Sequence, residues 1–576
     1  MRRALTILIM AFVVVIEIQV QSAKGQTYCN PMNLSYRFSL DKPSRREAAD
    51  PTIVLYKDNY YLFASKAGGY WHSTDLLDWK LVTNTALPLE NDAPTAVVIG
   101  DWLYFFTSLT DTIFRSNDPA HGKWEVYNSS FPLSMVSDIA VFADTDGRVY
   151  CYYGCSNNDG LMARELDVNN KLNPKGVPEV CLLKNPSGLG WKRSGNNLKK
   201  GFIPGAQASW MNKYNGKYYY QCAEPDIEFK TYSDVVYVSD KPLGPFTYAT
   251  HNPFSSKPTG FVCGANKGST FADKYGNWWH VATMTASDKH ASEPKLGLFP
   301  TSFDNDGNLV TNTGFGDYPL IMPKYKYTDA SELNPGWSLL SFHKIAEASS
   351  SLATNPVAFA FDENIGTYWS AKIGNPGEWL SVDLGSLCTI HAIQVNFAQN
   401  KTTLLGREGI QGQQYHMEYS ADKKDWKTLI DKTANTDDLT HQYEVMSMPV
   451  QARYVKIINH CVPDGTFSIS GFRVFGLGTS PKPTKVTSFF AVKDRRDPGM
   501  VKLSLGKHTA NTTGYNIRYG TQKDKLYHHY QVYKNTPVIF RGLDKDKAYW
   551  FEIDAFGESG VTPSIAHPSH ERVIAP

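Results

Sequence analysis

The chain has 576 residues, 42% of them apolar, and a formal net charge of +2 at pH 7. This length suggests several domains with ordinary apolar cores, and the near balance of charge excludes nucleic acid or an acidic polymer held by bulk charge as the partner. The eight cysteines form no CxxC pair and no histidine lies at zinc-finger spacing, which excludes a structural zinc site and a disulfide-built scaffold.

Residues 1–26 have the pattern of a signal peptide. Arg2 and Arg3 precede an interrupted apolar run over residues 4–20, and small and polar residues follow it. The run is too short for a good membrane span, and no later stretch approaches about 20 apolar residues. The sequence therefore predicts an exported protein, either periplasmic, cell-surface or secreted, without a transmembrane segment.

Residues 27–328 repeat one theme, a turn followed by an aromatic strand. Five such copies at irregular spacing predict an all-β fold that begins with a five-bladed β-propeller. A large sandwich whose hairpins are alike by chance is the alternative. The copies are residues 57–63, 100–106, 146–152, 215–220 and 276–281.

The innermost strand of each blade is expected just before its aromatic hairpin. Innermost strands of a propeller converge on one axis, so polar residues at their starts meet in one pocket. Asp50, Asp92 and Asp138 each precede an apolar strand and are expected to share such a site, although an Asp before a strand is usually a solvated turn residue. The predicted innermost segments are residues 48–54, 91–97, 135–142, 205–211 and 264–271.

Four stretches carry a resemblance to a known family: "ADPTIVLYKDNYYLFAS", "SDIAVFADTDGRVYCYYG", "NKYNGKYYYQC" and "GSTFADKYGNWWHVA". Over about residues 28–325 the chain resembles glycoside hydrolase family 43, the inverting five-bladed propeller enzymes. The resemblance implies hydrolysis of arabinose, xylose or galactose linkages in plant-type polysaccharides or oligosaccharides, with no organic cofactor. It also implies that Asp50 is the base and that Asp138 tunes the pKa of the acid and orients it.

The chain departs from the family pattern at two positions. Gln207 stands three residues before Trp210, where the family has its acidic Glu, and an amide cannot donate a proton as a carboxylic acid does. Lys267 stands where the family often has a His. Asp92, Trp210, Lys267 and Glu224 are the candidates for substrate binding.

The departures leave three interpretations open. Another acid, with Glu224, Glu228 and Glu293 as candidates, replaces the missing one, or the propeller binds glycans without cutting them. The third interpretation is an engineered change at Gln207 that traps substrate, but it would leave Lys267 unexplained.

Two further modules are predicted behind the propeller. Residues 341–478 resemble a discoidin module, also called coagulation factor 5/8 C-type, which implies sugar binding and a structural calcium held by Asp362 and Thr367. The late Glu common in such calcium sites would fall near Gly471, and without calcium Asp362 caps a turn. Residues 484–576 resemble a fibronectin type III sandwich with a spacing or docking role. A surface adhesion protein that acts through these modules is a further alternative.

Overall fold

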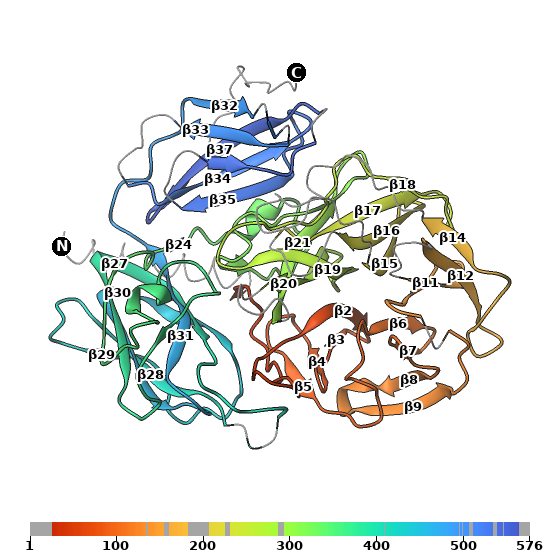
Figure 1. Cartoon of the computed structure of the whole chain (residues 1–576), viewed down its shortest axis with the longest axis horizontal. Helices are drawn as coiled ribbons and strands as arrows, with labels where there is room; N and C mark the ends of the chain where they lie inside the picture. The colour runs from red at the N-terminus through yellow and green to blue at the C-terminus, as the bar shows by residue number, and fades with distance from the viewer. Residues whose placement is uncertain are drawn as a thin grey trace, which may run out of the picture.

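The computed structural model of the chain is all-β, as predicted, with short 3-10 turns such as Pro119–His121 (Figure 1). No helix in the described part of the chain is long and apolar enough to cross a membrane. The described residues are 26–133, 136–154, 160–182, 207–224, 231–285, 293–407, 409, 411–494, 496–497, 499–505, 511–533, 538–544 and 547–563.

Five antiparallel sheets in chain order form the propeller. Each sheet begins with a strand rich in small and β-branched residues and continues with the aromatic strand of the predicted hairpin. The blades are β2 (Ala49–Tyr56), β3 (Asn59–Ser65), β4 (Tyr70–Ser73), β5 (Lys80–Val82); β6 (Thr95–Ile99), β7 (Trp102–Phe106), β8 (Ile113–Asp118), β9 (Lys123–Asn128); β10 (Ala140–Ala143), β11 (Val149–Tyr153), β12 (Leu161–Asp167), β13 (Asn173–Pro174), β14 (Glu179–Leu182); β15 (Gln207–Tyr214), β16 (Lys217–Glu224), β17 (Ser233–Ser239), β18 (Thr247–Tyr248); and β19 (Cys263–Ala272), β20 (Trp278–Thr285), β21 (Pro294–Phe303), β22 (Leu309–Thr311).

The first strand of every blade lies in an inner ring. Strands β2, β6, β10, β15 and β19 each contact the next in this order, and β19 contacts β2. Hydrogen bonds across the closing point join the first and last blades: the Ile53 amide donates to Ser269 Oγ at 3.2 Å, and the Ala48 amide donates to the Pro294 carbonyl at 3.0 Å. Strands β1 (Thr27–Tyr28) and β23 (Leu320–Ile321) pair beside this point. The starts of the inner strands therefore converge.

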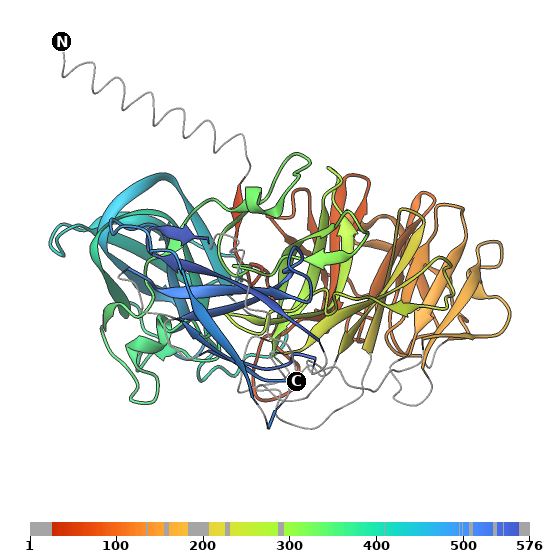
Figure 2. The ribbon, with the colours of Figure 1, turned by 90° about the horizontal axis from the view of Figure 1, so that it is seen from above.

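Two sandwich regions lie beside the propeller, which Figure 2 shows side-on. The first sheet runs in the order β24-β31-β27-β30-β28-β29, with β25 and β26 paired to it, and encloses a core around the fully buried Trp369. Its strands are β24 (Ser338–Leu339), β25 (Ile345–Ala348), β26 (Trp369–Ser370), β27 (Trp379–Phe397), β28 (Gln414–Ser420), β29 (Lys427–Lys432), β30 (His441–Cys461) and β31 (Ser468–Leu477). Cys388 and Cys461 in this region are free thiols.

The last region has two sheets with one core between them, which contains Leu543 and Tyr549. Its resemblance to fibronectin type III stays a prediction. The sheets are β32 (Phe489–Lys493), β33 (Val501–Leu505), β36 (Val538–Phe540), and β35 (His528–Tyr533), β34 (Gly514–Gly520), β37 (Trp550–Gly557), β38 (Gly560–Thr562).

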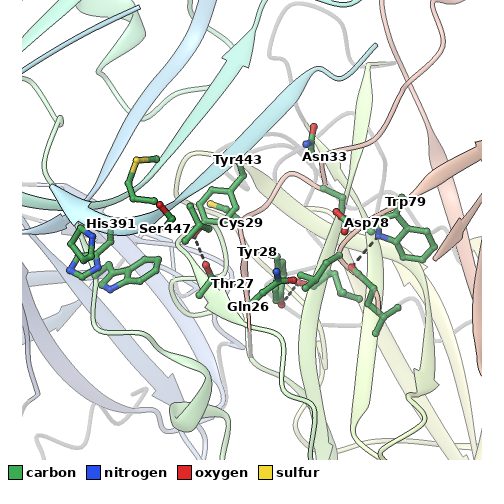
Figure 3. A pocket seen from close by; sticks show the side chains of 18 residues that line it. Gln26, Thr27, Tyr28, Cys29, Asn33, Asp78, Trp79, His391, Tyr443 and Ser447 are labelled. Atoms are coloured by element: carbon green, nitrogen blue, oxygen red, sulfur yellow. Dashed lines mark hydrogen bonds between the residues drawn. The ribbon is translucent and has the colours of Figure 1, made fainter. Parts of the chain in front are cut away.

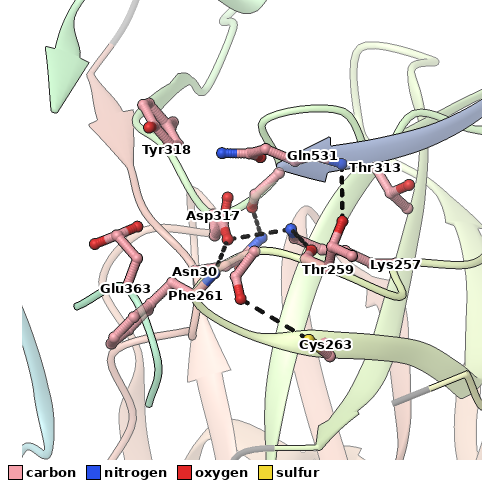
Figure 4. A network of polar contacts seen from close by, with 12 residues as sticks. Asn30, Lys257, Thr259, Phe261, Cys263, Thr313, Asp317, Tyr318, Glu363 and Gln531 are labelled. Atoms are coloured by element: carbon pink, nitrogen blue, oxygen red, sulfur yellow. Dashed lines mark hydrogen bonds and ion pairs between the residues drawn. The ribbon is translucent and has the colours of Figure 1, made fainter. Parts of the chain in front are cut away.

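A buried polar network joins the three regions, and Figure 4 shows the part of it around Asp317. Arg473 of β31 forms an ion pair with Glu363 and donates to the Asp317 carbonyl of the propeller at 2.5 Å. Tyr533 of the last region donates to Glu363 at 2.9 Å, and Asp317 pairs with Lys257 at 3.1 Å. Because a buried charge that loses its partner destabilises the fold strongly, these contacts link the three regions to one another.

A cavity of about 510 Å³ lies at the seam between the propeller and the first sandwich (Figure 3). Trp79 of blade 1 and Tyr443 of β30 line it, together with Trp337 and His391, whose rings stack with centroids 4.8 Å apart. Asp50, Asp138 and Lys267 are not among its lining residues. The site described next is therefore separate from this cavity.

Candidate active site

A left-handed residue lies just before or within four of the five inner strands. Asp50 has φ 52°, Ala93 has φ 51°, Asp138 has φ 53° and Lys267 has φ 44°. Side chains other than glycine rarely adopt this backbone region, and such strain persists only where the surroundings fix it and is common at functional sites. The repetition of this conformation at the centre of the propeller marks the inner-strand starts as a built site.

A polar side chain of the preceding blade fixes each of these residues. In three of them the backbone N–H donates to a hydroxyl, and in the fourth it donates to a carboxylate, so the strained turns are anchored across the blade boundaries. The pairs are Asp50 with Thr283 Oγ1 at 3.0 Å, Ala93 with Ser65 Oγ at 2.8 Å, Asp138 with Ser108 Oγ at 2.9 Å, and Lys267 with Asp234 Oδ1 at 2.7 Å.

The structure brings three of the predicted site residues together. Lys267 Nζ lies 2.9 Å from Asp50 Oδ1 and 3.6 Å from Asp138 Oδ1, so the two carboxylates share one ammonium ion. The side chains are only 11%, 8% and 8% exposed, respectively. The other oxygen of Asp50 accepts a hydrogen bond from Ser65. This is a buried charge cluster with two carboxylates and one cation.

The electrostatics of the cluster keep Lys267 protonated. Burial by itself lowers the pKa of Lys267, because it disfavours the charged form. The negative charges of Asp50 and Asp138 outweigh burial and raise the pKa above its ordinary value. Lys267 is therefore a cation and a hydrogen-bond donor throughout the physiological pH range, and it is a poor source of protons.

The sequence predicts that Asp92 is equivalent to Asp50 and Asp138, because all three precede an apolar strand. The structure contradicts this equivalence. Ala93 has the left-handed conformation and the hydroxyl contact instead. The Asp92 side chain is 57% exposed and pairs with Lys66 at 3.6 Å. Its role in substrate binding stays a prediction.

Gln207 begins the inner strand of the fourth blade. Its backbone pairs with Ala223, and the register then shifts before Trp210 pairs with Gln221. Blade 1 shows the same shift between Ala49 and Thr52. The backbone of Gln207 is thus equivalent to that of Ala49, the residue directly before Asp50, at the rim of the same inner ring.

The other predicted site residues lie in the fourth and fifth blades. The Trp210 indole donates to the Thr270 carbonyl at 2.8 Å, which ties the two blades together. Glu224 is buried at the end of β16, where its charge adds to the effect of burial in raising the pKa of Tyr237. Glu293 pairs with Lys295 at 3.5 Å. Glu228 lies outside the described residues.

The predicted calcium loop is closed by its own hydrogen bonds. Asp362 Oδ1 accepts from the Asn364 amide at 3.0 Å, and Asp362 Oδ2 accepts from Thr367 Oγ1 at 2.6 Å. Burial raises the pKa of Asp362 to about 6. No group of three or more His, Cys, Asp or Glu that could hold a metal occurs among the described residues. These hydrogen bonds support the capped turn that the sequence predicts for Asp362 in the absence of calcium.

Sequence reasoning missed the anchoring residues. Ser65 and Ser108 both come two residues after a buried phenylalanine of the second strand, in Phe63-Ala64-Ser65 and Phe106-Thr107-Ser108. That repeated spacing is a signal for the hydroxyl contact. Asp234 follows a serine at the start of β17 and has no counterpart in the earlier blades that would have marked it.

Comparison with known proteins identifies two of the regions. Residues 43–309 match the family model Glycosyl hydrolases family 43, and residues 345–465 match the model F5/8 type C domain. The propeller is a family 43 glycosidase domain. The sheet behind it is an F5/8 type C domain, so the resemblances found in these two regions of the sequence are confirmed.

The family 43 domain is similar to curated enzymes. It is 28% identical over 247 residues to the xylosidase/arabinosidase 43A of Humicola insolens, an alignment that covers 36% of this chain and 70% of that protein. It is 28% identical over 177 residues to a xylosidase/arabinosidase of Bacteroides ovatus, covering 26% and 51%. A solved glycoside hydrolase structure aligns over 76% of this chain and 99% of its own, with 16% identity and a TM-score of 0.44.

Proposed function

We propose that this chain is an exported glycoside hydrolase that acts on arabinose, xylose or galactose linkages of plant-type polysaccharide or oligosaccharide by an inverting mechanism. The contact of Asp50 and Asp138 with one ammonium ion at the inner ring is the observation that supports it most. The names of the similar enzymes favour xylose and arabinose among the three sugars.

Asp50 is suited to act as the base. An inverting glycosidase needs a carboxylate that takes a proton from the attacking water, and a second group that protonates the leaving oxygen. Lys267 and Ser65 each contact one oxygen of Asp50, so the carboxylate is held in one orientation while each oxygen keeps a lone pair for water. Asp138 shares Lys267 with it and sets the local charge, which is the role of pKa tuner and orienter.

The general acid that would protonate the leaving oxygen is the component that this chain lacks at the family's position. Gln207 occupies the acid position of the family pattern, and loss of general-acid help typically lowers the rate by about 10²–10⁴-fold. Glycosides with a good leaving group need little protonation and are affected least. We therefore expect turnover of aryl glycosides to exceed turnover of natural oligosaccharides by a wide margin.

A catalytically silent, glycan-binding propeller is the second candidate. Gln207 in the acid position and Lys267 beside both carboxylates favour it, because neither residue supplies a proton. The F5/8 type C domain would then act as an auxiliary sugar-binding module. Neither proposal requires the calcium implied by the discoidin resemblance, because Asp362 and Thr367 form a capped turn without it.

Kinetics on matched substrates separate the candidates. Aryl arabinofuranosides, xylosides and galactosides are assayed beside natural oligosaccharides with the wild type, Asp50→Asn and Gln207→Glu. The hydrolase proposal expects aryl turnover that Asp50→Asn removes, and a gain on natural substrates in Gln207→Glu. Binding of oligosaccharides without any turnover supports the second candidate, and unchanged turnover in Asp50→Asn contradicts the assignment of the base.

A further inference from the structure

A chain of hydrogen bonds lies behind Lys267 and connects the fourth and fifth blades. It starts at the Thr270 carbonyl, passes through two side-chain amides and the Thr270 hydroxyl, and ends at His280 and Asp234. The steps are Asn212 Nδ2 to the Thr270 carbonyl at 2.9 Å, Gln221 Nε2 to Asn212 Oδ1 at 2.6 Å, Thr270 Oγ1 to Gln221 Oε1 at 2.7 Å, Thr270 Oγ1 with His280 Nδ1 at 2.9 Å, and His280 Nε2 with Asp234 Oδ2 at 3.0 Å.

The first steps of the chain have a fixed direction. A carbonyl oxygen only accepts, so Asn212 presents its NH₂ group to the Thr270 carbonyl and its oxygen to Gln221. Gln221 must then donate to that oxygen, which leaves its own amide oxygen facing the Thr270 hydroxyl. The single hydroxyl hydrogen of Thr270 is therefore used on Gln221.

The direction of these hydrogen bonds determines which ring nitrogens of His280 carry a hydrogen. Since the Thr270 hydroxyl has no second hydrogen, its oxygen can only accept from His280, and Nδ1 carries a hydrogen. The other ring nitrogen faces a carboxylate oxygen of Asp234, which also accepts. A neutral imidazole has one N–H, whereas this arrangement needs two, or a proton on Asp234.

Asp234 is placed as an ionised acceptor. Its Oδ1 accepts from the Lys267 amide at 2.7 Å, and its Oδ2 accepts from the Gly268 amide at 3.1 Å in addition to facing His280. Three donors around one carboxylate favour its charged form. Asp234 is 2% exposed and His280 is fully buried, so a partner of opposite charge is required.

We propose that His280 is a buried imidazolium ion paired with the Asp234 carboxylate, and that this pair is the device that positions Lys267 in the pocket. Asp234 holds the left-handed turn at Lys267 through two backbone amides, and the pair with His280 holds Asp234. Gly268 lets the turn pack closely against β20, because a Cβ there would lie 2.1 Å from the Val281 carbonyl oxygen. The Lys267 ammonium is thereby fixed against Asp50 and Asp138.

The protonation of His280 is tested by nitrogen NMR of the full-length protein labelled with ¹⁵N-histidine. The His280 signals are assigned by their loss in His280→Gln or, if that variant does not fold, by correlation with the labelled backbone. We expect both ring nitrogens to carry a hydrogen at neutral pH, where an exposed imidazole is mostly neutral. A bare Nδ1 or a bare Nε2 overturns the imidazolium–carboxylate pair.

The positioning role is tested with Asp234→Asn and a matched control. Asp317→Asn also removes a buried carboxylate that accepts a backbone amide, that of Phe261 at 2.6 Å, and pairs with one cation, but it lies at the domain junction. Misplacement of a pocket group by about 1 Å can lower kcat by about 100-fold. We expect a loss of that order in Asp234→Asn and a kcat near wild type in Asp317→Asn, each per folded protein on an aryl glycoside.

The positioning role rests on the proposed function, and the two fail in different ways. A wild type without turnover refutes the hydrolase proposal, and the NMR result for His280 then still decides the ion pair. An active wild type whose kcat falls equally in Asp234→Asn and Asp317→Asn overturns the positioning role. Rescue supports it further if Asp234→Glu, which keeps the charge, recovers more activity than Asp234→Asn.

Discussion

The charge cluster of the pocket predicts the behaviour of Lys267→Met. This change keeps much of the side-chain volume and removes the ammonium that Asp50 and Asp138 share. At an effective dielectric constant of about 20, the attraction is about 6 kcal/mol over the 2.9 Å to Asp50 and about 5 kcal/mol over the 3.6 Å to Asp138. Desolvation of the three buried ions opposes these values by several kcal/mol each.

The net loss follows from leaving two carboxylates buried without a cation. Removal of one partner from a buried ion pair typically costs about 3–5 kcal/mol of unfolding free energy. Because the pKa of Lys267 is raised in the folded protein, its contribution is complete below the ordinary lysine pKa and is lost only as the pH rises above that value. The wild type therefore keeps it from pH 5 to pH 8, and the full loss in Lys267→Met is expected at pH 8.

The loss should shrink in acid. Two adjacent carboxylates without a cation disfavour double ionisation, so at pH 5 one of them in Lys267→Met takes up a proton more readily than at pH 8. The assay is urea unfolding of the full chain at both pH values. Lys66→Met is the control, because the Lys66–Asp92 pair has the same 3.6 Å separation but is about half exposed and contributes about 0–1 kcal/mol. A Lys267→Met loss as small as that of Lys66→Met, or one independent of pH, refutes the reasoning.

Three further predictions concern the acid position, the inner turn and the capped loop. Gln207→Glu should raise turnover of natural oligosaccharides, within the range of about 10²–10⁴-fold that general-acid help supplies. The gain should be larger when Gln207→Glu is combined with Lys267→His, because the Lys267 ammonium opposes retention of the acid's proton. Initial rates of the two single variants and the double variant measure this coupling. Gly268→Ala should lower kcat strongly, because its Cβ would lie 2.9 Å from the His280 ring and 2.1 Å from the Val281 carbonyl, whereas Gly276→Ala, whose Cβ would meet nothing within 4 Å, tests the effect of strain alone. Asp362→Asn should stabilise the chain above pH 6, because it removes the buried charge that the wild type carries there. The pKa of Asp362 is raised to about 6, so the stability that its protonated form contributes is present below about pH 4 and is lost as the pH rises through 6. Added calcium should leave the wild-type melting temperature unchanged, and a clear rise with calcium contradicts the capped-turn interpretation.

The sequence predicted the propeller because its signal is local. Each blade repeats a turn and an aromatic strand, and residues such as Tyr60 and Trp279 of these strands are fully buried in the observed core. The closing of the ring was harder to foresee. It depends on contacts between the first and last blades, such as Ile53 with Ser269, that no periodic pattern encodes.

The candidate site was predicted in its residue types and only partly in its geometry. Asp50 and Asp138 were found because each precedes an apolar strand. The same rule selected Asp92, although the strained position belongs to Ala93, because a one-residue difference in where a strand turns inward is invisible in the sequence. The sequence placed Lys267 among the site residues, but its ion contacts with Asp50 and Asp138 join blades separated by more than 100 residues, so no local pattern gives them.

In the proposed active site, the two departures from the family pattern, Gln207 and Lys267, would be physically coupled. A general acid must keep its proton at neutral pH, which requires surroundings that disfavour its charged form. A buried ammonium ion favours the charged form of any carboxyl group near it. Lys267, which Asp50 and Asp138 hold protonated, would therefore work against a glutamic acid in the same pocket. An uncharged Gln207 in the proposed acid position would remove that conflict, and the cluster of two carboxylates and one ammonium would then orient a sugar and activate water without supplying a proton to the leaving group.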